Sequence, residues 1–415
     1  MATVDGQAPL AGHLRPGDLV VVEQGVGEPA ALVERLVAES DALTGIEIFF
    51  GLSYTGLATE SLARKVRLSS FGAMAALAPL APAGLLEIVP CHYADVSRML
   101  RVRGGDALVV LIQVSPADAD GYHSLGVAVD YSCDLLDQAR VVIAEVNDRM
   151  PVTSAPKVHG SRFAATVHTS RPVHTVPTPS AGDLHRRIAE TAAELVPSGA
   201  ALQLGIGAVP SVVGGLLADR RDLRVHSALV GDWLLELARA GALSDEPGSV
   251  VVGGAAGSRE LYEYLASSGA EFRPVAELSP PGVLAGVDRL VAMNSALQVD
   301  LTGQVNAEVA GTRYLGGIGG QLDFLRGAQL SRDGRSIVML PATAVRGTKS
   351  RIVRELDQGT VTTPRSCVDF IITEYGCADL RGKALTERAE ALIAIAAPEH
   401  RDALAGEAAL QGLAS

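Results

Sequence analysis

The chain has 415 residues, of which 48% are hydrophobic, 20% charged and 4% aromatic, and its formal net charge is −12. At this length two domains are expected rather than one continuous core. The acidic balance argues against a nucleic-acid-binding face, which would need clustered basic residues, but it permits an anionic small ligand held by backbone N–H groups.

Short apolar runs rich in β-branched residues recur along the chain and predict buried strands. They lie at residues 18–22, 107–114, 141–146, 201–204, 249–252, 290–293, 336–340 and 368–373. Stretches with helical character separate many of these runs, at residues 29–40, 183–195, 232–240 and 386–397. Strand–helix alternation of this kind predicts an α/β fold whose sheets are largely parallel.

The uncharged stretch at residues 71–86 contains Pro79, Pro82 and Gly84 and is shorter than the ~20 residues of a membrane-spanning helix. We expect a buried helix and turn there, and no membrane partner. Residues 1–13 lack the basic and apolar regions of a signal peptide, so we expect a cytoplasmic protein. Four cysteines without metal-ligand spacing predict buried thiols and no metal site.

The clearest boundary in the chain lies at residues 168–182, where Pro172, Pro177 and Pro179 stand among serine, threonine and histidine. A stretch of this composition without hydrophobic periodicity predicts an extended linker. We therefore divide the chain near residue 180 into two α/β domains, residues 1–180 and residues 181–415.

A glycine-rich turn follows the predicted strand at residues 201–204. Residues 205–210 read Gly-Ile-Gly-Ala-Val-Pro, and Pro210 is expected to begin a helix. Glycines let the backbone approach a ligand closely, and a helix N-terminus presents N–H groups to an anion. Because the third glycine of the dinucleotide fingerprint is missing, the pattern by itself is equally typical of a tight turn without a ligand.

A second glycine-rich region follows the predicted strand at residues 290–293. Residues 316–320 read Gly-Gly-Ile-Gly-Gly, a run that suits neither helix nor strand and whose successive N–H groups can form an oxyanion hole for a thioester carbonyl. Upstream, polar side chains alternate along an extended segment: Gln298, Asp300, Thr302, Gln304 and Asn306. We expect this face to line a cleft, and the alternative is a pair of hairpin turns.

A few further polar groups are candidates for acid–base chemistry. Glu374 is more typical of a structural carboxylate than of a catalytic one. His226 and Ser227 are adjacent, and because neighbouring residues of a strand point to opposite faces, a direct Ser–His pair is not expected. His123 is expected to lie in a loop and to face the cleft, so we assign this histidine to the site.

Several segments in a fixed order carry a resemblance to a known family. In the second half of the chain they are residues 202–210, 299–308, 316–324 and 373–376, and in the first half residues 114–118, 121–126 and 147–151. Together they resemble the acetyl-CoA hydrolase/transferase family, the branch of class I CoA-transferases that includes 4-hydroxybutyrate and butyryl-CoA:acetate transferases. The resemblance is strongest over residues 183–401.

The resemblance implies an acyl-CoA enzyme of two similar α/β domains, with the active site between them. It implies that coenzyme A contacts a set of residues in the second half: Gly205, Ile206, Gly207, Ala208, Val209, Gly327 and Lys349. It also implies that Gly319 and Gly320 help to bind the thioester oxygen. By the same resemblance, the substrates are an acyl-CoA and a carboxylate such as acetate, and the chain forms a homodimer.

The chain departs from the family at the position that the resemblance assigns to the nucleophile. Family transferases carry a glutamate two residues after a histidine, which attacks the acyl-CoA and passes through an anhydride to a glutamyl-CoA thioester. Here the segment reads His226, Ser227, Ala228, and a methyl side chain forms neither adduct. Glu236, two helical turns further on, is expected to be exposed and not to replace the missing carboxylate.

Three interpretations of Ala228 stay open. The chain is an engineered Glu-to-Ala variant of a transferase, or it is a natural family member that processes acyl-CoA by hydrolysis, acyl transfer to another acceptor or decarboxylation, or it only binds acyl-CoA. The sequence does not separate the first two. The third is disfavoured, because a protein that only binds acyl-CoA has no need of a loop that polarises the thioester.

Overall fold

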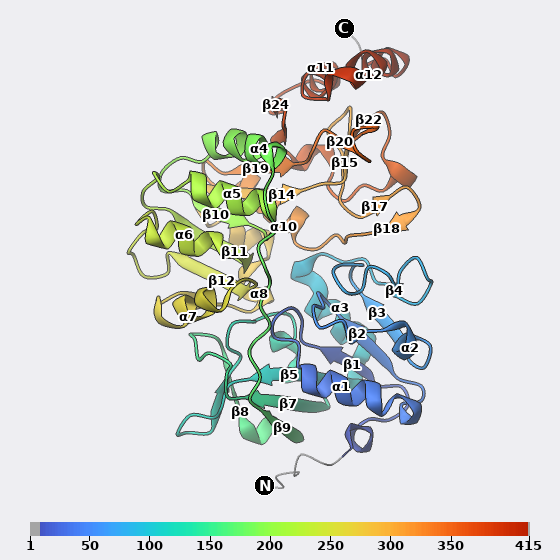
Figure 1. Cartoon of the computed structure of the whole chain (residues 1–415), viewed down its shortest axis with the longest axis vertical. Helices are drawn as coiled ribbons and strands as arrows, with labels where there is room; N and C mark the ends of the chain where they lie inside the picture. Colours follow the sequence, from blue (N-terminus) through green and yellow to red (C-terminus); the bar gives the residue numbers. More distant parts are fainter. Residues whose placement is uncertain (1–8, 414–415) are drawn as a thin grey trace. The chain divides into compact units, whose positions relative to one another are not determined.

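A seven-stranded sheet dominates the first part of the chain in the computed structural model, which describes residues 9–413 (Figure 1). Its strand order is β4-β3-β2-β1-β5-β7-β9, and every neighbouring pair is parallel. The strands are β1 (Leu19–Val22), β2 (Glu47–Phe50), β3 (Arg67–Ser70), β4 (Glu87–Ile88), β5 (Leu108–Val114), β7 (Val141–Asn147) and β9 (Ala165–Thr169). A parallel sheet of this kind confirms the predicted fold class.

A second large sheet has eight strands in the order β13-β12-β11-β10-β14-β19-β23-β24. The strands are β10 (Ala201–Leu204), β11 (Arg224–Val230), β12 (Val250–Ala255), β13 (Glu271–Phe272), β14 (Leu290–Ser295), β19 (Arg335–Met339), β23 (Phe370–Thr373) and β24 (Gly376–Asp379). The first of them, β10, pairs in parallel with β11 and β14, whereas β24 returns antiparallel to β23.

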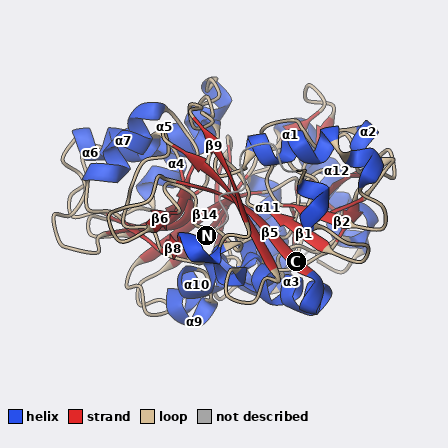
Figure 2. Ribbon diagram, turned by 90° about the horizontal axis from the view of Figure 1, so that it is seen from below, coloured by secondary structure: helices blue, strands red, loops and turns tan. Residues whose placement is uncertain are grey.

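Helices cover both faces of each large sheet, as Figure 2 shows for α1 and α2 opposite α3, and for α4, α5 and α6 opposite α9 and α10. The helices beside the first sheet are α1 (Ala30–Ala38), α2 (Glu60–Ala63) and α3 (Val96–Gly104). Those of the later chain are α4 (Asp183–Glu194), α5 (Ala208–Leu216), α6 (Trp233–Arg239), α7 (Arg259–Ser267), α8 (Val275–Leu278), α9 (Pro281–Leu284), α10 (Gln321–Leu330), α11 (Leu385–Ala394) and α12 (Pro398–Leu410).

Short strands form small ribbons outside the two large sheets. They are β6 (Tyr122–Ser124), β8 (Lys157–His159), β15 (Gln298–Asp300), β16 (Val305–Asn306), β17 (Val309–Ala310), β18 (Arg313–Tyr314), β20 (Thr343–Ala344), β21 (Lys349–Ser350) and β22 (Ile352–Val353). The pairs β6–β8 and β15–β16 are antiparallel. β6 contains His123, which was predicted in a loop, and β15 and β16 lie in the segment predicted as extended.

The sequence predictions agree with the structure mainly at buried strands and at helices with one buried face. Strands β1, β5, β7 and β10 are buried along their whole length, as expected for parallel strands covered on both faces. All eight predicted strands are present, and the four predicted helices are present with ends shifted by at most three residues. The predicted start of one helix was wrong: α5 begins at Ala208 and not at Pro210.

The predicted helix at residues 71–86 is wrong. The stretch is buried only in part, with residues 71–73, 77, 80 and 86 buried, and it runs through consecutive turns, with hydrogen bonds such as Leu77 N–H to the Met74 carbonyl. Pro79 and Pro82 lack the N–H groups that a continuous helix would use, and this explains the turns.

The four cysteines are free thiols, as predicted, but none of them is fully buried. Cys91, Cys133 and Cys367 are half-buried, and Cys377 is exposed. Cys377 lies in β24, the edge strand of the second sheet, which has a neighbouring strand on one side only. The predicted burial was therefore wrong, most clearly for Cys377, because an edge strand leaves side chains accessible.

Internal contacts divide the chain into two compact units. The first comprises Met1–Val176, Val250–Leu278 and Tyr314–Gly319, and the second comprises Pro177–Ser249, Ser279–Arg313 and Gly320–Ser415. A boundary at residue 180 between independently folding domains stays a prediction. Residues 1–8, part of the segment that lacks signal-peptide features, lie outside the described residues. Over residues 9–413, no helix is long and apolar enough to cross a membrane.

Candidate active site

The turn between β10 and α5 contains two glycines, Gly205 and Gly207, with free space beside them. Gly207 precedes α5 with φ +126° and ψ −175°, a conformation essentially restricted to glycine. A Cβ atom at Gly205 or Gly207 would meet no heavy atom within 4 Å. Because Pro210 has no N–H, the donors of the first helical turn are those of Ala208 and Val209. The turn therefore offers backbone N–H groups to an anion.

Ala228 lies beside this turn. Leu202 of β10 is opposite Val225 of β11, and Ser227, the residue before Ala228, has its Oγ 3.1 Å from the carbonyl oxygen of Leu204, the last residue of β10. The side chain of Ala228 is half-buried. A carboxylate at this position would lie next to the turn, whereas the methyl group that is present supplies neither a nucleophile nor a base.

The two residues before Ala228 are buried in β11. Ser227 Oγ lies 3.1 Å from the Leu204 carbonyl oxygen and 2.9 Å from that of Leu229, so its hydroxyl donates to the backbone of the sheet. His226 is 5% exposed. Glu236 is exposed on α6, as predicted. The Ser227 hydroxyl is therefore engaged by backbone carbonyl groups of the sheet.

The glycine loop at residues 316–320 ends directly at α10. Ala73 N–H donates to the Gly316 carbonyl oxygen over 2.8 Å, and Tyr93 N–H donates to the Gly319 carbonyl oxygen over 2.9 Å. Gly319 has φ +53°, and a Cβ atom there would meet open space. Gly320 is the N-cap of α10, so its N–H and those of the first turn have no partner within the helix. The loop is thus held by its carbonyl groups.

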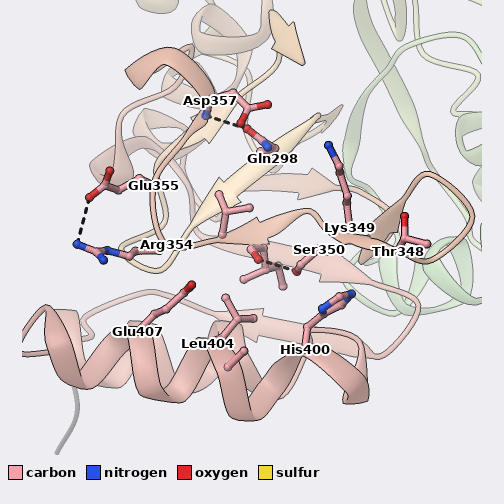
Figure 3. A pocket seen from close by; sticks show the side chains of 13 residues that line it. Gln298, Thr348, Lys349, Ser350, Arg354, Glu355, Asp357, His400, Leu404 and Glu407 are labelled. Atoms are coloured by element: carbon pink, nitrogen blue, oxygen red, sulfur yellow. Dashed lines mark hydrogen bonds and ion pairs between the residues drawn. The ribbon is translucent and has the colours of Figure 1, made fainter. Parts of the chain in front are cut away.

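In the polar segment at residues 298–306, Gln298 lines the open cavity shown in Figure 3, whereas Asp300 and Asn306 are buried, so the predicted cleft lining is confirmed for Gln298 and wrong for these two residues. The Asp300 carboxylate accepts hydrogen bonds from Thr302 and Gln304, and Asn306 Nδ2 donates to the Val309 carbonyl. Local amide and hydroxyl donors satisfy the carboxylate, as in an Asx turn. The hairpin alternative was correct for this segment.

His123 is a strand residue, and its predicted place in a loop was wrong. It lies in β6 and is 8% exposed, with Nδ1 2.7 Å from the Ser115 carbonyl oxygen. Its ring packs against Phe163, with centroids 5.2 Å apart. These contacts favour a structural histidine, and a catalytic role for His123 stays a prediction.

Two predicted coenzyme contacts lie elsewhere in the second unit. Gly327 is buried in α10, where a Cβ atom would lie 2.3 Å from that of Leu284, so this glycine permits close packing with α9. Lys349 lines an open cavity of about 620 Å³ (Figure 3). His400 and Arg354 line the same cavity, together with acidic residues such as Glu407.

Sequence reasoning missed a buried acidic cluster in the first unit, consisting of Glu23, Glu28, Asp130 and Glu145. Each of these side chains is at most 5% exposed. Glu23 directly follows β1, and its Oε2 accepts from Gln113 N–H over 2.6 Å. Two glutamates shortly after a buried apolar strand were the signal that could have revealed the cluster.

Burial raises the pKa of every carboxyl group in this cluster. For Glu23 the cause is desolvation, followed by repulsion from Asp130. Desolvation raises the pKa of Asp130 to about 6, against the stabilising hydrogen bonds of Ser132 and Gln24. Over residues 9–413, no group of three or more His, Cys, Asp or Glu side chains is arranged to hold a metal ion.

Comparisons with known proteins agree with this architecture over nearly the whole chain. The Acetyl-CoA hydrolase/transferase N-terminal domain matches residues 5–163, and the Acetyl-CoA hydrolase/transferase C-terminal domain matches residues 257–408. The chain is 38% identical to the 4-hydroxybutyrate coenzyme A transferase of Clostridium kluyveri, over 94% of this chain and 93% of that protein. The chain belongs to the acetyl-CoA hydrolase/transferase family.

Solved structures of similar proteins have the same fold. RipA from Yersinia pestis is 34% identical, with a TM-score of 0.91 that covers 98% of this chain and 97% of that one. A 4-hydroxybutyrate CoA-transferase from Porphyromonas gingivalis is 33% identical, with a TM-score of 0.80 over 97% and 96%. As a member of this family, the protein is an acyl-CoA-processing enzyme, and acyl-CoA is its substrate class.

Proposed function

We propose that this enzyme cleaves its acyl-CoA thioester directly, by acyl transfer to water or another small acceptor, without an enzyme-bound glutamyl intermediate. The observation that carries the proposal is that Ala228, at the position that the resemblance assigns to the nucleophile, follows Ser227, whose Oγ lies 3.1 Å from the carbonyl oxygen at the end of β10. In this proposal coenzyme A binds at residues 205–209, and the thioester carbonyl binds at Gly319 and Gly320.

In the hydrolytic form of the reaction, the oxygen of water adds to the acyl carbon and the carbon–sulfur bond breaks. The proton released by water goes to the CoA thiolate, which gives a carboxylic acid and a free thiol. Negative charge develops on the thioester oxygen, and N–H donors already in place stabilise it. The N–H groups of Ala208 and Val209 favour an anionic part of the coenzyme at the helix N-terminus.

Carboxylate exchange is the second candidate, supported by the 38% identity to a 4-hydroxybutyrate coenzyme A transferase. In that reaction CoA moves from an acyl-CoA to a free carboxylate. A shared family implies that the coenzyme and the thioester are bound in the same way. The two candidates differ in whether the enzyme supplies a carboxylate of its own.

Ala228→Glu separates the two candidates. For direct transfer, the unchanged protein consumes an acyl-CoA from a broad panel with no dependence on added carboxylate, and its intact mass stays free of acyl or CoA adducts. Ala228→Glu then gains carboxylate exchange and a borohydride-sensitive enzyme thioester, because the added side chain lies beside the turn. The matched control is Ala228→Gln, which fills the same space without a nucleophile and should gain neither.

Two results would overturn direct transfer. The first is an acylated or CoA-bearing form of the unchanged protein in intact-mass analysis. The second is acyl-CoA consumption that requires a carboxylate acceptor. No turnover with any acyl-CoA of the panel would instead favour a protein that only binds the coenzyme.

Several further parts of the proposal rest on the family alone. We include Lys349 among the coenzyme contacts because a family lysine lies near this position. By the same argument the enzyme is a homodimer, whereas its cytoplasmic location stays a prediction from the sequence. For carboxylate exchange, the second candidate, acetate is the first acceptor to test, because a relative that is 33% identical is a butyryl-CoA:acetate CoA-transferase from Anaerostipes caccae. Size-exclusion chromatography with light scattering tests the oligomeric state.

A further inference from the structure

The direction of the Gly320 N–H group is fixed by a hydrogen bond to its neighbour. The peptide group between Gly319 and Gly320 is trans, so its N–H points opposite to the Gly319 carbonyl. Tyr93 N–H holds that carbonyl oxygen at 2.9 Å. Whatever fixes the backbone of Tyr93 therefore fixes the direction in which the Gly320 N–H points.

Tyr93 is in turn held by its side chain. Gln24 Nε2 donates to the Tyr93 hydroxyl oxygen over 2.7 Å, and the Gln24 side-chain carbonyl accepts from Leu52 N–H over 3.0 Å. The tyrosine ring packs edge-on against Phe71, with centroids 6.0 Å apart. Burial, followed by repulsion from Asp130, raises the pKa of the Tyr93 hydroxyl, so the phenol stays neutral.

Gln24 is held by the acidic cluster of the first unit. Its own N–H donates to Asp130 Oδ2 over 2.8 Å, so both its backbone and its side chain are fixed. Gly51 permits this placement, because a Cβ atom there would lie 2.4 Å from Gln24 Oε1. A continuous series of hydrogen bonds thus runs from Asp130 through Gln24 and Tyr93 to Gly319.

We propose that Tyr93 and Gln24 are positioning residues for the thioester-polarising N–H of Gly320. The proposal rests on the proposed function, since it requires that this loop binds the thioester oxygen. Neither side chain has to touch the substrate. A donor displaced by a fraction of an ångström still binds the ground state but stabilises the developing oxyanion less, so turnover falls more than affinity.

The experiment compares two tyrosine-to-phenylalanine variants in the full chain. Tyr93→Phe removes the acceptor of the Gln24 hydrogen bond and keeps the ring. The matched control is Tyr131→Phe, which removes another buried hydroxyl of the same unit, one that donates to the Val22 carbonyl over 3.1 Å. Gln24→Met is a second test variant, because it keeps the size of the side chain and loses the same hydrogen bond.

Two measurements are made on each variant. The first is steady-state turnover of the best acyl-CoA of the panel. The second is the 13C chemical shift of a ketone analogue of acyl-CoA, in which a methylene group replaces the sulfur and the carbonyl is labelled. For Tyr93→Phe and Gln24→Met, we expect kcat to fall ~10-fold with KM changed less than about twofold. The bound carbonyl signal should move back towards its value in water, and Tyr131→Phe should match the unchanged protein in both measurements.

Equal behaviour of Tyr93→Phe and Tyr131→Phe, with Gln24→Met also unaffected, overturns the positioning role while leaving the proposed function intact. If Tyr93→Phe does not fold by circular dichroism, the comparison of Gln24→Met with Tyr131→Phe decides the outcome. If the unchanged protein turns over acyl-CoA without shifting the carbonyl signal, the loop does not polarise the thioester and the positioning role falls with it. If it neither binds nor turns over acyl-CoA, the proposed function itself fails.

Discussion

The two large sheets carry different residues at the same topological position: an acidic side chain in the first sheet and a glycine in the second. In the first, β1 lies between β2 and β5, and in the second, β10 lies between β11 and β14. Strand order reverses at these points, where open α/β sheets bind ligands beyond the carboxyl ends of their strands. The first residue after β1 is Glu23, and the first residue after β10 is Gly205.

The difference extends into the helix that follows each strand. At the N-terminus of α1, Ala31 N–H already donates to the Glu145 carboxylate over 2.8 Å. At the N-terminus of α5, the glycines before Ala208 leave open space. The first unit therefore fills its anion site with its own side chains, and the second leaves that site open. A shared topology fixes where a ligand can bind, and the side chains at that position decide whether one does.

A carboxylate introduced at the open turn of the second unit should fill it as the first unit fills its own. Of the changes considered, we expect this one to have the largest effect. Gly205→Glu adds a side chain into open space and keeps the Gly205 carbonyl that accepts from Trp233 Nε1 over 3.1 Å. The new charge competes with the coenzyme for the same N–H groups. Coenzyme A affinity, measured by calorimetry, should fall ~10- to 100-fold, the value of one charge-assisted hydrogen bond.

Gly205→Gln is the control for the size of the new side chain. It should cost less affinity than Gly205→Glu, because it brings the same bulk without the charge. Both variants should keep the thermal midpoint of the unchanged protein. If the two variants lose coenzyme A affinity equally, the size of the new side chain and not its charge excludes the coenzyme. The explanation by competing negative charge would then be wrong.

The filled site of the first unit should show in the pH dependence of stability. Burial raises the pKa of Asp130 to about 6, above its value in the unfolded chain. The folded state therefore binds the proton more tightly, so this stabilising contribution is complete below about pH 4 and is lost as the pH rises through about 6. We expect Asp130→Asn to reduce the decline in the free energy of unfolding between about pH 4 and 7 by about 2–3 kcal/mol.

Urea unfolding at several values of pH measures this effect. The control is Asp118→Asn, an exposed carboxylate of the same unit whose pKa is lowered by Lys157. That variant should leave the decline over this range in place. If Asp130→Asn left the pH dependence of the free energy of unfolding unchanged, Asp130 would be ionised in the folded protein over this whole range. The buried site would then tolerate a charged carboxylate.

The smallest effect is expected on the outer side of α1. Glu34 forms an ion pair with Arg171 at 2.8 Å, which lowers its pKa, but both side chains are nearly half exposed. Exposed pairs of this kind contribute less than ~1 kcal/mol. Glu34→Gln should therefore change the free energy of unfolding, measured in urea, by less than that amount, whereas Glu145→Gln should destabilise the same helix more. The reverse order would show that the surface pair, and not the buried carboxylate, holds α1.

Long buried elements were predictable because they depend on local composition. The strand at residues 201–204 was predicted with the bounds that β10 has, and β5 and β7 differ from their predictions by one residue. A run of apolar β-branched residues has few alternatives to a covered parallel strand. Where several conformations satisfy the same composition, as at residues 71–86 and 298–306, the sequence alone predicted the wrong one.

The residues of the candidate site also differ in whether local sequence or tertiary contacts determine their place. Residues 205–209 and 316–320 could be found because several glycines close together have few roles other than a turn or a close approach. His123 could not be placed, because its burial depends on Phe163 and Ser115, which only the folded chain brings to it. Nor does composition reveal that Gly327 makes room for Leu284.

The sequence by itself determined the α/β class, the positions of the main strands and the family, since each of these follows from the local order of residues. The tertiary structure alone decided which strand–helix turn is open, that Glu23 and Asp130 are buried together, and that Tyr93 holds the Gly319 carbonyl. The physical reason is that desolvation and hydrogen-bond direction depend on groups far apart in the chain. Asp130 and Gln24, joined by one hydrogen bond, are separated by 106 residues.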